Sequence, residues 1–213
     1  MKVTIVYDNE TWQPGLEAAW GFSCLVEADS QRLLFDTGGQ GNILLKNLAT
    51  LNLDPQSISE IFISHGHWDH LGGLTELLRL NPDVRVYLPG SCSRPPEARE
   101  VISVQGPLEI SGNFFSTGEL PGAEQSLVVK TAKGPMVICG CSHPGVGTIL
   151  QAASRFGRVS ALIGGLHGFQ EYELLADLEF VCPCHCTQHK AEIMARYPKT
   201  ALSGGAGKVI EIG

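Results

Sequence analysis

One stretch organises the chain: Ile61-Phe62-Ile63-Ser64-His65-Gly66-His67-Trp68-Asp69-His70-Leu71-Gly72-Gly73-Leu74. It places three histidines and one aspartate within six positions, directly after an apolar run that predicts a buried strand. Alternate residues of an extended chain point the same way, so we expect His65, His67 and Asp69 to converge, while His70 turns aside as a helix begins. Imidazole and carboxylate ligands suit zinc, with iron or manganese as alternatives. An open catalytic metal site needs about three protein ligands, so these four donors are more than one site needs and too few for two. The motif therefore predicts further ligands elsewhere in the chain.

The bulk composition indicates one α/β enzyme domain spanning residues 1–213. The formal charge of −7 comes with no run of lysine or arginine, so we expect no nucleic-acid partner. No apolar run approaches the roughly 20 residues that span a bilayer, and the N-terminal residues lack the pattern of a signal peptide. Together with an odd number of cysteines, seven, these features predict a soluble cytoplasmic protein with reduced thiols and no membrane partner.

Strand and helix patterns alternate along the chain, which predicts a layered α/β fold. A hairpin is expected from Phe22–Glu27 and Arg32–Phe35, a helix from Leu71 to Leu80, and an irregular surface loop over residues 89–100. Further strands are expected at Val84–Leu88, Leu108–Ile110, Leu127–Thr131, Met136–Cys139, Ala161–Ile163, Phe180–Cys182 and Val209–Ile212, and further helices at Gly41–Leu51, Val146–Phe156, Tyr172–Leu178 and Ala191–Tyr197.

Three of the four histidines outside the motif follow apolar strands, at the carboxyl ends where α/β sheets place their sites. His143 follows the strand that ends at Cys139, His167 follows the next one, and His185 follows the strand that ends at Cys182. A single histidine at a strand end is usually a structural turn residue, but six of the seven histidines lie at such ends. We therefore expect His143 and His185 to be metal ligands. His167 is expected either to contact a ligand or the substrate or to be structural, and His189 is expected at the surface.

The cysteine spacing does not match a structural metal site. Cys139 and Cys141 are separated by one residue, as are Cys182, Cys184 and Cys186, whereas zinc ribbons place two or more residues between paired cysteines. The common iron–sulfur spacings are also missing. Most of these side chains are expected to pack as small apolar groups. Cys141 and Cys186 are the exceptions, because they flank proposed ligands.

Several motifs resemble those of a known family. The pattern His65-x-His67-x-Asp69-His70 resembles the signature of the metallo-β-lactamase-fold superfamily. Asp36 in Leu-Leu-Phe-Asp-Thr-Gly is similar to its earlier motif, and His185 in Pro-Cys-His to its last one. Four stretches are more narrowly similar to the subgroup of dihydropterin–ribofuranosylaminobenzene phosphate synthases: Ser64–Leu74, Gly140–Gly145, Gly164–His167 and His185–Thr187.

The resemblance implies an αββα four-layer sandwich of two mixed sheets flanked by helices, with two divalent metal ions at one edge. It implies that His65, His67 and His143 hold one metal, that Asp69, His70 and His185 hold the other, and that Asp36 orients a ligand from behind.

This sequence also departs from the family pattern. Cys141 stands where much of the superfamily has an aspartate that bridges the metals, so either a thiolate or hydroxide alone would join them. Glu119 is a rival to His143 as a ligand. Gln188 replaces the glycine that the subgroup usually has after His-Cys-Thr.

These observations predict a metal-dependent hydrolase that uses a bridging hydroxide on a small-molecule substrate, with Asp69 as ligand and catalytic proton carrier. Arg94 and Arg99 have a solvated surface role as the more frequent alternative; if they reach the site, they would favour an anionic substrate, as would the start of the helix after His70. One alternative is a pterin-related synthase or transferase at the same site, which needs an aromatic pocket. A second alternative is iron or thiolate redox chemistry that uses Cys141, Cys184 or Cys186. The sequence does not specify the oligomeric state.

Overall fold

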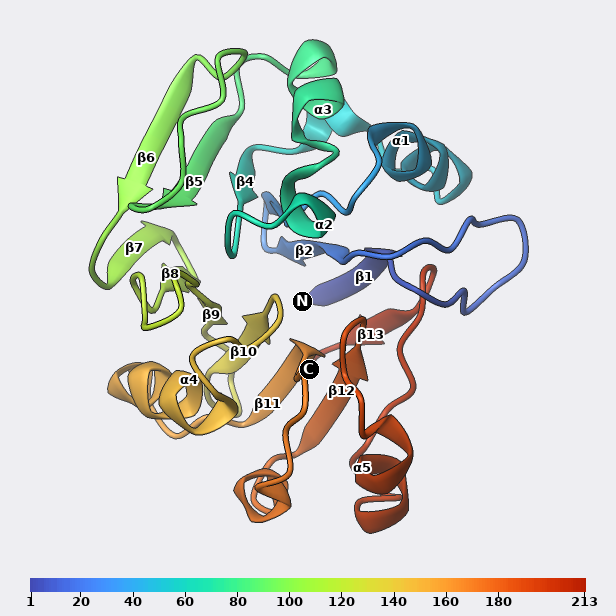
Figure 1. Ribbon diagram of the computed structural model, residues 1–213, viewed down its shortest axis with the longest axis vertical. Coiled ribbons are helices and arrows are strands. Elements are labelled where there is room, and N and C mark those ends of the chain that lie inside the picture. Colours follow the sequence, from blue (N-terminus) through green and yellow to red (C-terminus); the bar gives the residue numbers. More distant parts are fainter.

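Two β-sheets pack face to face in the computed structural model, which describes residues 1–213, and helices cover their outer faces (Figure 1). Both sheets are mixed, with parallel and antiparallel strand pairs. This architecture confirms the predicted αββα sandwich.

The first sheet has seven strands in the order β13-β1-β2-β3-β4-β5-β6. Pairs from β1 to β3 are antiparallel and those from β3 to β6 are parallel. The predicted hairpin is confirmed, with Cys24 opposite Phe35 and Ala28 opposite Gln31. The strands are β1 (Lys2–Tyr7), β2 (Ser23–Ala28), β3 (Gln31–Phe35), β4 (Glu60–Phe62), β5 (Arg85–Pro89), β6 (Glu100–Val104) and β13 (Val209–Glu211). The sequence pattern did not predict β6, because this edge strand has only one fully buried residue to mark it.

The second sheet has six strands in the order β12-β11-β10-β9-β8-β7. The strands are β7 (Leu108–Ser111), β8 (Phe114–Ser116), β9 (Leu127–Val129), β10 (Met136–Cys139), β11 (Ala161–Gly165) and β12 (Phe180–Cys184). Strands β10, β11 and β12 are parallel neighbours, so their carboxyl ends meet at one edge. The loops that carry His143, His167 and His185 therefore leave the sheet side by side.

Three apolar layers hold the sandwich together. The central layer packs the two sheets against each other and includes Phe35 and Phe62 from one sheet and Ile138 and Ile163 from the other. A second layer packs α1 (Gly41–Thr50) and α3 (Leu74–Leu80) on the first sheet. A third packs α4 (Val146–Ala153) on the second sheet and includes Ile193 of α5 (Lys190–Arg196). Burial of an apolar side chain contributes about 1.5–3 kcal/mol, so these layers supply the main driving force for the fold.

The predicted helix from Leu71 to Leu80 is wrong in its extent. It is divided into α2 (Trp68–Leu71) and α3 at Gly72 and Gly73. A Cβ at Gly72 would lie 2.3 Å from the Gly39 carbonyl oxygen, and one at Gly73 would lie 2.4 Å from that of Thr37. The two glycines therefore let this turn pack directly on the loop that follows β3.

Three short 3₁₀ helices complete the structure: η1 (Pro55–Ser57), η2 (Ser154–Phe156) and η3 (Tyr172–Leu175). The last one replaces the predicted helix Tyr172–Leu178. Leu175 is its only buried side chain, and Leu178, which is also buried, lies beyond its end.

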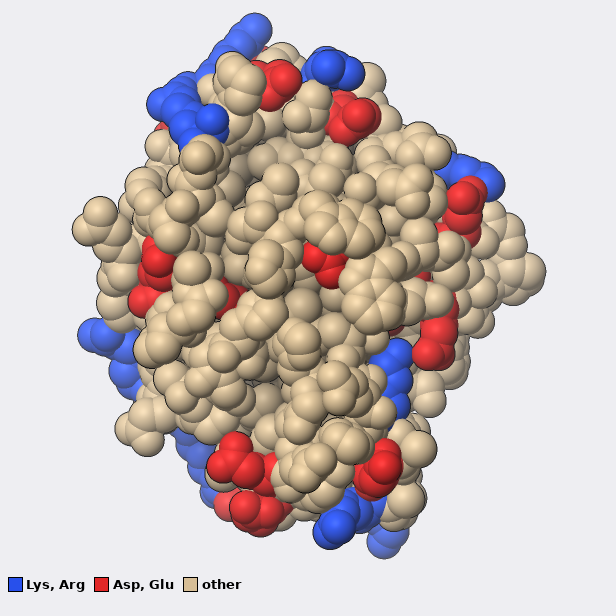
Figure 2. Space-filling view, viewed as in Figure 1, with Lys and Arg blue, Asp and Glu red and all other residues tan.

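None of the helices has the length and apolar character that a membrane span requires. Figure 2 shows most lysine and arginine side chains toward the margin of the face viewed in Figure 1, whereas acidic side chains lie both at the margin and, in a few places, nearer the centre.

Candidate metal centre

The first group of donor atoms joins the two sheets. His65 and His67 come from the segment between β4 and α2, and His143 comes from the loop after β10; their donor atoms lie within 4.8 Å of one another. His65 Nε2 is 3.1 Å from His67 Nδ1. His143 Nε2 is buried without a hydrogen-bond partner. The structure thus brings together the three residues that the family resemblance grouped.

Ser64 fixes the proton position on His65. The Ser64 hydroxyl donates to Asp36 Oδ2 at 2.7 Å and lies 2.9 Å from His65 Nδ1. Since the hydroxyl proton is used on Asp36, His65 Nδ1 must donate to Ser64 Oγ. Its Nε2 then presents a lone pair toward His67 and His143.

The second group of donor atoms contains Asp69, His70 and His185, all buried. Asp69 Oδ2 lies 3.2 Å from His185 Nε2 and 3.8 Å from His70 Nε2. The expectation that Asp69 would group with His65 and His67 is wrong, because the chain leaves the extended conformation at Trp68 and enters α2. Asp69 therefore turns with His70 toward the loop after β12.

Asp36 lies behind His70. Its Oδ2 accepts from His70 Nδ1 at 2.6 Å, and its Oδ1 accepts from the Ser64 backbone N–H at 2.7 Å. Burial works to lower the pKa of His70, but the Asp36 carboxylate outweighs it and raises the pKa overall. The contact leaves His70 Nε2 pointing into the centre. Asp36 therefore orients a candidate ligand from behind, as the resemblance implied.

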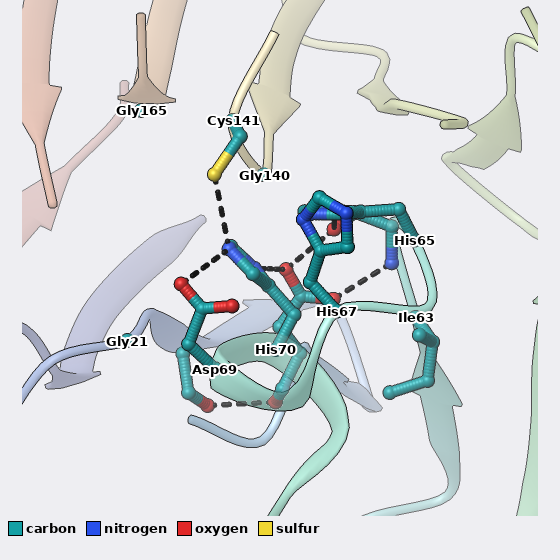
Figure 3. A network of polar contacts seen from close by, with 12 residues as sticks. Gly21, Ile63, His65, His67, Asp69, His70, Gly140, Cys141 and Gly165 are labelled. Carbon is teal, nitrogen blue, oxygen red and sulfur yellow. Dashed lines mark hydrogen bonds and ion pairs between the residues drawn. The ribbon is translucent and has the colours of Figure 1, made fainter. Parts of the chain in front are cut away.

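Cys141 lies between the two groups of donors. Figure 3 shows its Sγ against His70, 3.2 Å from Nε2, with Asp69 beside it. Its Sγ also comes within 4.8 Å of donor atoms of His65, of the pair His143 and His167, and of the pair His185 and Cys186. Contact with the Cys186 thiol and burial both raise the pKa of Cys141. A nearby divalent cation would oppose this and favour the thiolate.

Glu124, which the sequence reasoning missed, holds the loop that carries Cys141 and His143. Its Oε1 accepts backbone N–H bonds from Gly140, Cys141 and Ser142 at 3.0–3.1 Å, and its Oε2 accepts from His143 N at 2.9 Å. Glu119, the expected rival ligand, instead accepts from Ser91 N at 2.9 Å and joins neither group of donors. One acid in a short segment gave no sequence signal for this role.

Asp8 and Asn9, also missed, hold His185. Asp8 Oδ1 accepts from the backbone N–H of His185 at 2.9 Å, and burial raises the pKa of Asp8 to about 6. Asn9 Oδ1 accepts from His185 Nδ1 at 3.0 Å and from Gly21 N at 3.1 Å. His185 Nε2 is left without a hydrogen bond and faces Asp69. The only sequence signal was an acid directly after the first strand.

Several residues around the candidate metal centre have a strained backbone conformation. Non-glycine residues with positive φ include Asp36 at 51°, Ser142 at 62°, His167 at 46° and His185 at 44°. Such conformations cost of order 1–3 kcal/mol each and persist where the surroundings impose them, often at functional sites. His167 lies at the edge of the cluster, with its ring centroid 4.8 Å from that of His143. His189 lies outside the donor groups and contacts Gln170.

Arg94 and Arg99 are exposed and engaged within or beside their own loop, as in the surface role that base rates favoured over a role at the site. Arg94 donates to the backbone carbonyls of Ala98 and Arg99, and the Arg99 guanidinium pairs with Asp83. Trp20, which the sequence reasoning did not single out, donates from its indole N–H to Asp69 Oδ2 at 2.9 Å. Its ring lies edge-on to His185, with centroids 5.1 Å apart.

The donor set fits divalent metal ions. Each group supplies three nitrogen or oxygen atoms, and the buried Nε2 atoms of His143 and His185 make no hydrogen bond. Burial lowers the pKa of His65 and His143, and that of His185 to about 3, so these rings are neutral at pH 7. Neutral imidazole and carboxylate are the ligands of zinc and similar metals.

The chain is similar to proteins of one family, both in a family model and in a curated relative. Residues 21–147, more than half of the chain, match the model of the metallo-beta-lactamase superfamily. The chain is 26% identical to 7,8-dihydropterin-6-methyl-4-(beta-D-ribofuranosyl)-aminobenzene-5'-phosphate synthase of Methanocaldococcus jannaschii, over 98% of this chain and 95% of that protein.

Two further similarities are informative. The crystal structure of Tm1679, described as a metal-dependent hydrolase of the beta-lactamase superfamily, is 29% identical with a TM-score of 0.80 and covers 100% of this chain and 99% of its own. Over 38% of this chain and 28% of that protein, the sequence is 40% identical to atrochrysone carboxyl ACP thioesterase of Emericella nidulans.

Proposed function

The chain belongs to the metallo-beta-lactamase superfamily, and we propose that it is a metal-dependent hydrolase with a dinuclear zinc centre. The proposal assigns His65, His67 and His143 to one metal ion and Asp69, His70 and His185 to the other. Tm1679, a relative that covers the whole chain, carries the description of a metal-dependent hydrolase.

One observation supports this function above the others: two groups of three donors lie next to each other, and each contains a buried histidine nitrogen that makes no hydrogen bond. Nε2 of His185 faces Asp69 Oδ2 at 3.2 Å, and a cation between them would bind both atoms. A buried polar atom without a hydrogen bond costs about 1–3 kcal/mol. Two such atoms facing one centre are accounted for if each binds a cation.

The protein side chains position the reaction. When bound, the two metal ions would supply an activated water nucleophile and polarise the bond to be cleaved. Asp69 is oriented by the Trp20 indole and lies between His70 and His185, where its carboxylate can take the proton of the attacking water. Asp36 and Asn9 fix the ring orientation of His70 and His185, so little reorganisation is needed during the reaction.

The substrate remains a prediction. The preference for an anionic substrate would come from the metal ions alone, because the guanidinium groups of Arg94 and Arg99 are engaged in their own loop and with Asp83. The local similarity to a thioesterase adds thioesters to the substrates to be tested.

A second function is favoured by a different observation. The full-length similarity to the Methanocaldococcus jannaschii enzyme supports a synthase or transferase at the same centre. The aromatic pocket that this reaction needs could use Trp20 and Trp68, which are 53% and 60% exposed and both lie near Gly39.

The experiment that separates these functions combines metal analysis with a reaction screen. We expect about two zinc ions per chain after purification with zinc, and turnover of at least one phosphodiester, lactone, thioester or β-lactam. A protein that binds both metals but forms a pterin conjugate, and hydrolyses none of these compounds, would replace the hydrolase by the synthase. A protein that binds no divalent metal would overturn both.

A further inference from the structure

The structure contains a preformed cavity of about 620 Å³ next to His65 and His67. We propose that it binds an uncharged hydrocarbon group of the substrate while the reacting bond lies at the metal centre. The inference rests on the proposed function and specifies the substrate class: small molecules with an aliphatic or aromatic group attached to the hydrolysed bond. The volume lies in the usual range for small-molecule sites, roughly 300–1,000 Å³.

The walls of this cavity are mainly apolar. Leu71, Leu74 and Leu88 form one side, and Pro95 and Pro96 of the loop between β5 and β6 form another. His65, Gly66 and His67 also line the cavity, which makes it continuous with the first group of donors. A hydrocarbon group in this space would remove these apolar surfaces from water.

The cavity offers few charged groups to a polar substrate group. Arg94 is the only charged residue other than histidine among its lining residues, and its guanidinium is bound to the carbonyls of Ala98 and Arg99. No carboxylate lines it. An anionic group of the substrate would find one cation there, that of the exposed Arg94, whereas a hydrocarbon group would match the apolar walls.

The loop that closes the cavity is fixed in place. Ser91 N donates to Glu119 Oε2 at 2.9 Å, and Cys92 N donates to the Pro89 carbonyl at 3.0 Å. Arg94 ties the other end of the loop to its own backbone. A preformed pocket needs less ordering of the protein when the ligand binds, so these contacts favour binding.

One segment connects the cavity with the metal centre. Gly122 and Ala123 line the cavity, and a Cβ at Gly122 would lie 3.1 Å from His143 Cβ. The next residue, Glu124, holds the backbone of His143. The distance between the cavity wall and the His143 donor is therefore set by a few consecutive residues.

A series of straight-chain carboxylates tests the inference. Acetate, butyrate, hexanoate and octanoate would be titrated calorimetrically into the full protein, with and without bound zinc. We expect the affinity to rise by about fourfold per methylene until the cavity is filled, since burial of a methylene contributes about 0.8 kcal/mol.

Variants locate the effect. Ser93→Trp places a large side chain on an exposed loop residue that lines the cavity, and we expect it to weaken octanoate binding at least tenfold while acetate changes less than twofold. Cys92→Phe is a second filling variant, because Cys92 Sγ lies 3.2 Å from the position of a Cβ on Gly66. The matched control is Ser154→Trp, the same change at an exposed serine in η2, which should bind octanoate like the wild type.

The outcomes separate this inference from the proposed function. Affinity that does not depend on chain length, or that is unchanged in both filling variants, would overturn the hydrocarbon pocket even in a protein that binds zinc and hydrolyses substrates. A chain-length dependence in a protein that binds no zinc would retain the pocket and reject the metal-dependent hydrolase.

Discussion

The two sides of the metal centre are held in different ways. On the side of the first sheet, His65, His67, Asp69 and His70 come from one segment of six residues, and Asp36 accepts hydrogen bonds from the His70 side chain and from Ser64. On the side of the second sheet, the candidate ligands come from separate loops whose backbones are bound by buried carboxylates. The first side thus depends on side-chain chemistry that is local in sequence, and the second on loop conformations set by distant partners.

Glu124 and Asp8 are these distant partners. Glu124 binds four consecutive backbone N–H groups of the loop from Gly140 to His143, and Asp8 binds that of His185. Bonds from N–H groups to a carboxylate are stronger than those between neutral groups. They offset the cost of the positive φ at Ser142 and His185. Comparable changes on the two sides should therefore have different consequences for stability.

The largest effect on function is expected on the first side, from His67→Ala. The exposed side chain makes no helix-cap hydrogen bond, so the stability of the fold should change by less than about 0.5 kcal/mol. Loss of a supporting partner of a metal ligand typically costs 10–100-fold, so loss of a ligand should reduce turnover by more than about 100-fold.

Metal analysis and thermal unfolding of this variant would check the prediction. Metal content should fall by about one ion per chain at an unchanged melting temperature. His189→Ala is the control, because His189 lies outside both groups of donors. Retention of both metals and of full activity in His67→Ala would show that the first group is not a metal site.

On the second side, Glu124→Gln should lower both stability and metal affinity. The amide can keep its oxygen toward Gly140, Cys141 and Ser142, but its NH₂ group would then face the N–H of His143. One buried N–H without an acceptor costs about 1–3 kcal/mol. We expect the free energy of unfolding measured in urea to fall by this amount. The metal affinity of the first group should fall about 10–100-fold.

Glu119→Gln is the matched control, since Glu119 lies on the same segment and contacts Ser91 instead of a ligand loop. Its metal affinity should equal that of the wild type. If Glu124→Gln binds metal as tightly as this control, the loop conformation does not depend on the carboxylate.

This contrast also explains how much the sequence could predict. The layered α/β class and the gathering of histidines at one sheet edge followed from the strand pattern, whereas the αββα sandwich, the grouping of His65 with His67 and His143, and the place of Asp36 were implied by the family resemblance. Glu124, Asp8 and Asn9 could not be found, because a side chain that binds a distant backbone leaves no spacing pattern. Glu119 was considered instead of Glu124 because a sequence does not show which acid of a loop points inward. The extent of the helix after His70 was wrong because close packing at Gly72 and Gly73 is a tertiary effect.

Asp36→Asn sharpens the comparison from the first side. The amide oxygen can still accept one hydrogen bond, but the carboxylate that receives His70 Nδ1 and two donors from Ser64 is lost. We expect affinity for the second metal ion to fall about 10–100-fold. Stepwise zinc titration would measure it, with Asp29→Asn as the control at an exposed turn that also has positive φ. If affinity for the first metal ion falls instead, the substitution acts mainly through Ser64 on His65, and less through His70.

The smallest effect is expected from Trp20→Phe, which spans the two sides because the Trp20 indole donates to Asp69 and its ring packs on His185. Phenylalanine keeps the ring contact and removes only the N–H. A hydrogen bond contributes about 0.5–1.5 kcal/mol net, and this side chain is 53% exposed, so metal affinity and turnover should fall about two- to tenfold. Trp68→Phe is the control, because no hydrogen bond joins Trp68 to Asp69. A loss as large as that of Asp36→Asn would mean that the orientation of Asp69 depends on the indole more than on its position in α2.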